Sequence, residues 1–136
     1  MKKLILALCL ACAVSTSAQA FFGLFKSGYK DGVWDGEYQA SDGENTRVVL
    51  TIKDGKIVDC VLEARDDMGN IKDENHGKDG SPEDYRRAQR AVREMKKYPA
   101  LLIEYQDMDK FDALTGASVT YSAMRQAVKE ALDKAK

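Results

Sequence analysis

Residues 46–64 read TRVVLTIKDGKIVDCVLEA, and this stretch decides the fold. It contains two runs rich in β-branched residues, 46–53 and 56–64, separated by Asp54-Gly55. Branched side chains favour strands, and Asp-Gly between two such runs favours a type I′ turn because both turn positions need a positive φ. The stretch therefore predicts an antiparallel β-hairpin.

The hairpin carries apolar side chains on both faces if its two strands pair without irregularity. Strands of this kind are buried at least partly on both faces, so we expect the hairpin to be central in its sheet. The two apolar sets are Val48, Leu50 and Ile52 on one face, and Val49, Val58, Cys60 and Leu62 on the other. The pairs expected across the ladder are Ile52 with Ile57, Val49 with Cys60, and Val48 with Val61.

The segments on either side of the hairpin are a strand and a loop. Residues 29–38, punctuated by glycines, read as a turn followed by a first short strand. We expect Trp34 to pack in the core or on a sheet face, with stacking beside a ligand as the alternative. Residues 65–80 are polar and rich in Asp, Asn and Gly, and they read as a loop. The spacing of acidic residues around His76 in this loop does not fit an EF-hand, so we expect no metal site.

A long helix is expected after this loop. Ser81 is its cap and Pro82 its first residue. Basic residues cover one side of the helix, where we expect the ion pairs Glu83–Arg87 and Arg90–Glu94. Pro99 is expected to end the helix. The apolar stripe on its other side consists of Tyr85, Ala88, Val92 and Met95.

The last third of the chain completes the fold class. Residues 100–105 can form a helix or a strand, because periodicity does not decide at this length, and residues 110–114 read as a short strand. A final helix is expected over residues 119–135. The order of strands, helix, strand and helix predicts an α+β domain, a small, mostly antiparallel sheet with a central hairpin, packed by two main helices.

The first 20 residues have the organisation of a signal peptide. Two lysines precede an apolar run, residues 4–14, and Ala18-Gln19-Ala20 is a small-x-small cleavage site. Cleavage leaves a single domain, residues 21–136. An uncleaved membrane anchor is the alternative, because residues 4–25 carry no charge. Either way, we expect the domain to be exported, in the periplasm or on the outer face of the cytoplasmic membrane.

The charge balance argues against nucleic-acid binding, and the cysteines argue against a disulfide inside the domain. The chain carries 21 basic and 22 acidic side chains, for a net charge of −1. Without the two lysines of the signal the balance is 19 basic against 22 acidic, which gives no basic surface for nucleic acid. Because Cys9 and Cys12 lie in the signal, Cys60 has no disulfide partner inside the domain and is expected to be a core side chain.

Residues 112–118, Asp-Ala-Leu-Thr-Gly-Ala-Ser, lie directly before the final helix. Ser118 is in position to cap that helix, because serine is a preferred N-cap and helical periodicity begins just after it. A helix start offers unpaired N–H groups and the positive end of the dipole to an anion such as phosphate. Gly116 allows a tight turn and a close approach to a ligand. The residues indicate a hydroxyl held at an anion-binding helix start.

This stretch resembles the flavinylation motif of the FMN-binding domain family, Asp-x-x-(Ser/Thr)-Gly-Ala-(Ser/Thr). The family includes the C subunit of the sodium-translocating NADH:quinone reductase and the G subunit of the Rnf complex. Asp112, Thr115, Gly116 and Ala117 match the fixed positions, and Ser118 matches the last hydroxyl. The glycine-rich opening at residues 29–36 and the phrase Asp-Gly-Lys-Ile-Val at 54–58 are also similar to the family, so the resemblance covers residues 28–136.

The resemblance implies a covalently bound cofactor. A flavin transferase would attach FMN through a phosphoester to the Ser118 hydroxyl, although threonine is the commoner acceptor in the family. Asp112 would be read by the transferase or would support the loop. Thr115, Gly116, Ala117 and Thr120 would shape the phosphate site.

The implied function is that of an electron carrier and not of a complete enzyme, because the sequence contains no second catalytic constellation. The expected partners are the flavin transferase and membrane or periplasmic redox proteins, namely membrane flavoproteins, quinone-linked complexes or secreted reductases. The N-terminal segment would supply any contact with the membrane. Non-covalent FMN binding and a flavin-free exported binding module are the alternatives. A hydrolase acting through Ser118 is disfavoured, because the chain has no Gly-x-Ser-x-Gly elbow.

Overall fold

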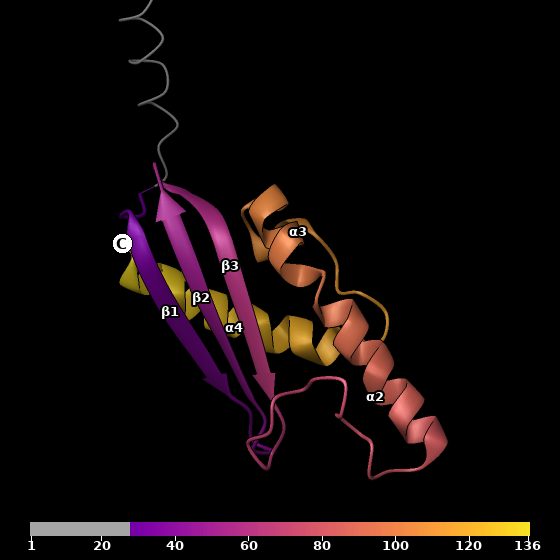
Figure 1. Cartoon of the computed structure of the whole chain (residues 1–136). Coiled ribbons are helices and arrows are strands. Elements are labelled where there is room, and N and C mark those ends of the chain that lie inside the picture. Colours follow the sequence, from indigo (N-terminus) through magenta and orange to yellow (C-terminus); the bar gives the residue numbers. More distant parts are fainter. Residues whose placement is uncertain (1–27) are drawn as a thin grey trace, which may run out of the picture.

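The computed structural model describes residues 28–136, and the predicted signal peptide, residues 1–20, lies outside them. A three-stranded antiparallel sheet in the order β1-β2-β3 forms one layer, and helices form the second (Figure 1). This is the predicted α+β architecture. Within the described residues no helix has the length and apolar character needed to cross a membrane. The elements are β1 (Gly32–Gln39), β2 (Asn45–Lys53), β3 (Lys56–Arg65), α2 (Pro82–Met95), α3 (Tyr98–Tyr105), the 3-10 helix η1 (Met108–Lys110) and α4 (Ser118–Lys134).

The turn of the β2–β3 hairpin has the predicted geometry. Asp54 and Gly55 both have a positive φ, 54° and 75°, and Ile52 pairs with Ile57 as expected. Beyond this pair, a β-bulge between Thr51 and Ile52 shifts the register by one residue. The other two expected pairs are therefore wrong. The pairs observed are Leu50 with Cys60, Val49 with Val61, and Val48 with Leu62.

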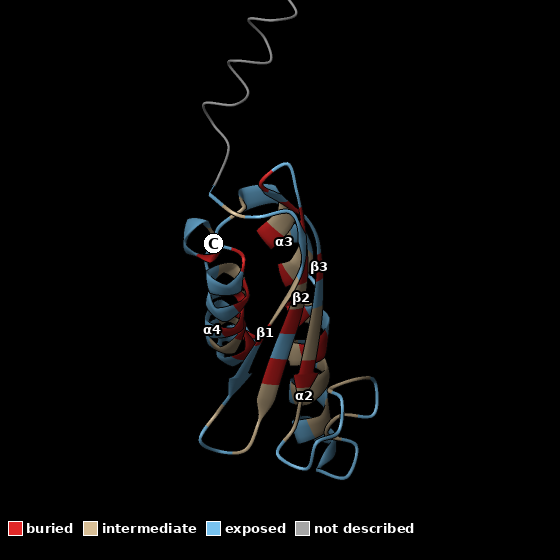
Figure 2. Cartoon of the chain, turned by 90° about the vertical axis from the view of Figure 1, so that its left-hand side faces the viewer, coloured by how far each residue is buried: buried red, intermediate tan, exposed pale blue. Residues whose placement is uncertain are grey.

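The bulge brings apolar residues from both strands of the hairpin onto one face of the sheet. Cys60 and Leu62 now share the covered face with Leu50, because side chains alternate with a period of two and the extra residue reverses that alternation. The opposite face is open within residues 28–136, where Val33 is 67% exposed and Val61 is 55% exposed (Figure 2). The expectation of burial on both faces is wrong. Only β2 is central in the sheet, and β3 forms an edge.

Helix α4 lies across the covered face against β1 and β2, and α3 packs against β3 (Figure 1). The closest approach is at Gly36 of β1. A Cβ atom there would lie 1.9 Å from the Ala127 carbonyl oxygen and 2.7 Å from the Ala131 nitrogen. Ala127 and Ala131 are fully buried, so small residues on both elements allow the two backbones to touch.

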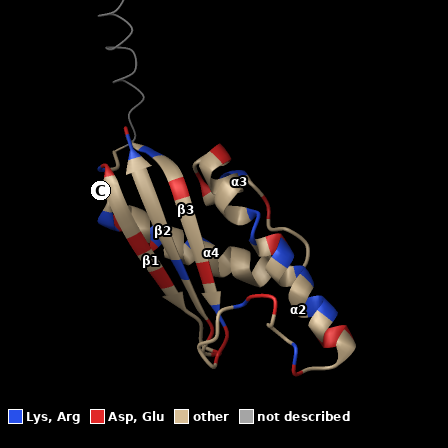
Figure 3. Cartoon of the chain, in the orientation of Figure 1, with Lys and Arg blue, Asp and Glu red and all other residues tan. Residues whose placement is uncertain are grey.

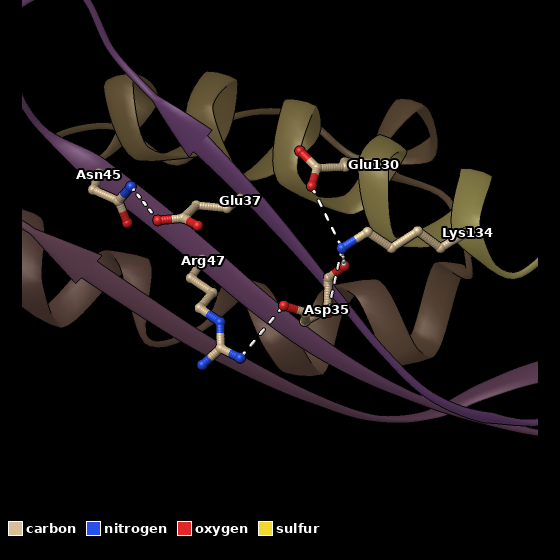
Figure 4. A network of polar contacts seen from close by, with 6 residues as sticks. All are labelled: Asp35, Glu37, Asn45, Arg47, Glu130 and Lys134. Atoms are coloured by element: carbon tan, nitrogen blue, oxygen red, sulfur yellow. Dashed lines mark hydrogen bonds and ion pairs between the residues drawn. The ribbon is translucent and has the colours of Figure 1, made fainter.

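Strand β1 is held from both sides. On the covered face Trp34 packs against the core, and its indole N–H donates to the Lys30 carbonyl at 2.9 Å, which supports the packing interpretation of this residue. At the edge of the sheet, Lys134 of α4 donates to the Asp35 carbonyl at 2.8 Å and also bonds its carboxylate (Figure 4). This bond and the charge of Lys134 hold the pKa of Asp35 below its usual value. Arg47 approaches the same carboxylate at 3.4 Å.

Helix α2 begins where the sequence predicts, and it ends before the predicted stop at Pro99. Ser81 caps α2 and accepts a hydrogen bond from the Asp84 N–H at 3.1 Å, as predicted. Pro99, expected to end that helix, instead lies in the first turn of α3, so the undecided segment 100–105 is helical. The strand predicted over 110–114 is wrong. That segment runs beside helices and not along a sheet edge, and tyrosine hydroxyls bond its backbone.

Cys60 lies in the core at 6% exposure, and burial raises the pKa of its thiol to about 12. In a Cys9→Ser, Cys12→Ser chain, we expect a thiol reagent at about pH 8 to label Cys60 only as fast as the domain opens. The unfolded thiol ionises near pH 9, so the free energy of unfolding should fall as the pH rises from about 9 toward 12. Immediate labelling of the native protein would contradict this expectation.

Candidate functional site

Residues 112–118 form the turn that leads from η1 into α4. The Ala117 N–H donates to the Leu114 carbonyl at 3.0 Å, and Thr115 and Gly116 lie at the tip of the turn. Gly116 has a φ of +92°, a conformation that glycine adopts without strain and other residues rarely adopt. Glycine at this position is therefore required by the backbone of the turn itself.

Ser118 is the first residue of α4, and Ala117 occupies the N-cap position without a side-chain cap. The expectation that Ser118 caps the helix is wrong by one residue, because the Ala117 carbonyl already accepts the Tyr121 N–H at 3.1 Å. The Ser118 side chain is exposed, and no group in residues 28–136 hydrogen-bonds its hydroxyl. The hydroxyl is accessible to another molecule.

The first turn of α4 presents backbone donors beside this hydroxyl. In the described part of the chain, the N–H groups of Ser118, Val119 and Thr120 have no protein acceptor. The helix is 17 residues long, and its dipole adds positive potential at this end. Unpaired donors and a positive dipole end together suit an anion such as a phosphate group.

Tyr98 holds this turn from below. The residue is fully buried, and its hydroxyl donates to the Ala117 carbonyl at 2.8 Å while accepting the Leu114 N–H at 3.0 Å. Burial raises the pKa of Tyr98 above its usual value, so the hydroxyl stays protonated and can donate. One side chain at the start of α3 thus bonds both ends of the turn, and sequence analysis did not single it out.

A cluster of aromatic rings supports the same turn. The Tyr98 ring lies 5.8 Å from that of Tyr121 and 6.4 Å from that of Phe111, measured between centroids. The Tyr121 hydroxyl is within hydrogen-bond distance of the Met108 and Phe111 carbonyl oxygens, at 2.5 and 3.0 Å. The segment before the motif is therefore fixed by side chains from α3 and α4, with no strand partner.

We expect Tyr98→Phe to lower the free energy of unfolding by about 1–3 kcal/mol, because it leaves the Ala117 carbonyl and the Leu114 N–H without their partner. Urea denaturation measures the change. Tyr105→Phe is the matched control, since Tyr105 is 41% exposed and its hydroxyl has no bond within the described residues. Equal losses in the two variants would show that the Tyr98 hydroxyl does not hold the turn.

Arg90 of α2 lies directly against the turn, on a helix rich in basic residues (Figure 3). A Cβ atom at Gly116 would lie 3.2–3.3 Å from Arg90 side-chain atoms. The predicted Arg90–Glu94 pair is wrong, because Glu94 instead pairs with Lys97 at 2.9 Å. Within residues 28–136 no carboxylate pairs with Arg90. Together with the exposed hydroxyl and the unpaired N–H groups, this free guanidinium fits a phosphate monoester.

The other residues of the motif divide between the surface and the core. Asp112 and Thr115 are exposed on the same turn as Ser118. Thr120 is 8% exposed, so it faces inward and contributes to the surface of the site through its backbone N–H alone. Ala117 is 3% exposed. Its N–H donates to the Leu114 carbonyl, and its carbonyl oxygen accepts the Tyr98 hydroxyl, so neither group is available to a ligand. The structure brings five of the predicted residues onto one turn and leaves Thr120 beneath it.

The polar loop, residues 65–80, is ordered by α2. Gln89 donates to the carbonyl oxygens of Asp73 and His76 at 3.0 and 2.9 Å, and the Tyr85 hydroxyl donates to the Glu74 carbonyl at 2.8 Å. Among the described residues, no group of three or more His, Cys, Asp or Glu side chains is placed to hold a metal ion. The loop therefore contacts the side of α2.

Comparison with known proteins gives a family and a fold. The family model described as FMN-binding domain matches residues 43–133. A crystal structure of a Clostridium perfringens protein is 19% identical, with a TM-score of 0.62, and the alignment covers 79% of this chain and 88% of that chain. A solution NMR structure of a Clostridium thermocellum protein is 24% identical, with a TM-score of 0.45, over 79% of this chain and 92% of the other. The curated proteins give no match.

Proposed function

This chain belongs to the FMN-binding domain family, and on that premise we propose that it is an exported electron carrier with FMN attached through a phosphoester to Ser118. Family membership supports flavin binding. The covalent bond, the export and the electron transfer are the further steps of the proposal. Retention by a covalent bond suits a domain outside the cell, where a dissociated cofactor would be lost.

The observation that carries the proposal is the placement of the Ser118 hydroxyl. It is exposed on the last residue of the motif, beside the unpaired N–H groups of Ser118, Val119 and Thr120. The Arg90 guanidinium lies across the same turn. A phosphate bonded to this hydroxyl would meet donors and positive charge without any rearrangement of the helix.

The attachment is a phosphoryl transfer. The Ser118 Oγ forms a bond to the phosphorus of a flavin nucleotide, the bond from phosphorus to the leaving group of that nucleotide breaks, and the hydroxyl proton is released. The protein therefore gains FMN less one water. The partner that performs the transfer is the flavin transferase, and its recognition of Asp112 is supported by the exposure of that residue. The bound flavin supplies electron transfer, and the chain supplies its position.

The redox partners follow from the place of the domain. We propose that it exchanges electrons with membrane flavoproteins, quinone-linked complexes or secreted reductases, in the periplasm or at the outer face of the cytoplasmic membrane. The N-terminal segment, cleaved or retained, delivers the domain there. Electron exchange needs no further catalytic group from this chain, since the flavin carries the chemistry.

We expect Arg90→Ala to slow flavin attachment on the order of tenfold, because the variant loses a charge-assisted contact to the phosphate. The rate is followed by intact mass after the transferase and donor are added to unmodified protein. Arg87→Ala is the matched control, because Arg87 lies one turn away on α2, is 75% exposed and already pairs with Glu83 and Asp84. Equal rates for Arg90→Ala and wild type would show that Arg90 does not contribute to the phosphate site.

The test of the function is whether the exported chain, produced with a flavin transferase, carries flavin that survives denaturation. Flavin absorbance in the native protein, with flavin fluorescence retained on a denaturing gel, is the expected result. If the native protein absorbs as a flavoprotein but loses its flavin on denaturation, the FMN is bound non-covalently and not through a phosphoester. A colourless chain, from a host in which the transferase modifies another family member, would contradict flavin binding. The flavin-free binding module would then be the remaining hypothesis.

A further inference from the structure

A groove runs along α4 from the neighbourhood of Ser118. Its volume is about 300 Å³, at the small end of the range for ligand pockets. Small and apolar side chains form most of its lining, with one aromatic ring among them. One wall consists of Val119, Ser122 and Ala123 from α4. The other comes from the end of β1, the turn after it and the start of β2, and consists of Tyr38, Ala40, Glu44 and Thr46.

The α4 wall of this groove begins at Val119, one residue after Ser118. Val119 is the next residue of the helix and is 71% exposed, and Ser122 lies one turn further on the same face as Ser118. Gln126 also lines the groove, eight residues and therefore about 12 Å along the helix axis from Ser118. A group tethered to the Ser118 hydroxyl can therefore lie along the groove.

The side chains of the groove suit a flat aromatic ring with one polar edge. Tyr38 is 38% exposed, and its hydroxyl bonds nothing within residues 28–136, so its ring is available for stacking. Val119 and Ala123 offer apolar contact on the helix side, and the Gln126 amide offers both a donor and an acceptor. The groove has one charged side chain, Glu44, which pairs with Lys72 at 2.8 Å. A second cavity near α4 is lined by six charged side chains, among them Asp109 and Arg125, which pair at 2.7 Å, and it is less suited to such a ring.

We propose that this groove binds the isoalloxazine ring of the FMN carried by Ser118, with Tyr38 as its aromatic neighbour; this inference rests on the proposed function. The ring then lies between Tyr38 on one wall and Val119 on the other, and the open side of the groove is left for electron exchange with a partner. Tyr38 acts as a positioning residue. The chain thereby sets both the attachment point and the surroundings of the ring.

The test compares Tyr38→Phe with Tyr105→Phe in protein loaded with FMN. A phenol beside an excited flavin quenches its fluorescence by electron donation, whereas a phenylalanine ring of the same shape does not. Tyr105 is the matched control, because it is 41% exposed and does not line the groove. We expect Tyr38→Phe to lengthen the fluorescence lifetime of the flavin several-fold, and Tyr105→Phe to leave it unchanged.

A second variant fills the groove without touching a tyrosine. Ala123→Leu should displace the ring, so that the visible absorption of the flavin loses its fine structure and matches FMN in water. Near-ultraviolet circular dichroism checks that each variant is folded, and intact mass checks that it is loaded. Unloaded wild type would count against the proposed function. Loaded protein with an unchanged lifetime in Tyr38→Phe and an unchanged spectrum in Ala123→Leu would overturn the placement of the ring alone.

Discussion

Ser118→Ala is expected to abolish covalent flavin completely. The variant removes the one oxygen that would form the phosphoester, and no neighbouring hydroxyl has the same place at the start of α4. Ser118→Thr should keep the modification, since threonine offers an equivalent hydroxyl. Because Ser118 is exposed and its hydroxyl makes no bond within residues 28–136, neither change should alter the free energy of unfolding by more than about 0.5 kcal/mol.

The measurement is the intact mass of each exported chain produced with the same flavin transferase. Ser122→Ala is the matched control, since Ser122 is an exposed serine one turn along the same face of α4. It should be loaded as fully as wild type. Full loading of Ser118→Ala, or an equal loss in Ser122→Ala, would show that the acceptor is not Ser118.

Gly36→Ala is expected to lower the free energy of unfolding by about 3 kcal/mol or more. The new Cβ would lie 1.9 Å from the Ala127 carbonyl oxygen, and the atoms it meets are helix backbone, which cannot rotate away. The helix must lift from β1, and every contact between α4 and the sheet weakens with it. For a domain of this size the loss lowers the Tm by more than about 10 °C.

Thermal unfolding followed by circular dichroism measures this loss. Gly28→Ala is the matched control, because an added Cβ there meets no atom within 4 Å, and it should leave the Tm almost unchanged. Because α4 also begins the flavin site, Gly36→Ala should reduce loading with FMN. A Gly36→Ala chain as stable as wild type would mean that α4 and β1 do not approach as closely as the structure indicates.

The sequence predicts the parts of this fold that local chemistry determines. The Asp54-Gly55 turn follows from the positive φ that both residues need, and the start of α2 follows from the Ser81 cap. The motif before α4 predicts a hydroxyl at a helix start, and the structure places Ser118 there, one residue inside the helix. Such features depend on neighbours within a few residues, so one sequence suffices to read them.

Other features depend on residues far apart in the chain. The bulge beside Ile52 exchanges the side chains of β3 between the two faces of the sheet. The alternation of apolar and polar residues in 56–64 does not predict this extra residue. Tyr98 bonds Leu114 and Ala117, which are 16 and 19 residues away, and Arg90 covers Gly116 from another helix. A Tyr directly before a Pro at a helix start carries no local sign of this contact. The sequence alone therefore does not predict that Tyr98 supports the turn or that Arg90 lies where it can neutralise a phosphate.

The most direct test of the account is the location of FMN in the wild-type chain. Cleavage after Lys110 and Arg125 releases residues 111–125, a peptide with five hydroxyl side chains, on Thr115, Ser118, Thr120, Tyr121 and Ser122. Tandem mass spectrometry of this peptide assigns the modified residue. The account predicts a gain of FMN less one water on Ser118 alone. An unmodified peptide, in a host whose transferase modifies another family member, or FMN on one of the other four hydroxyls, would contradict it.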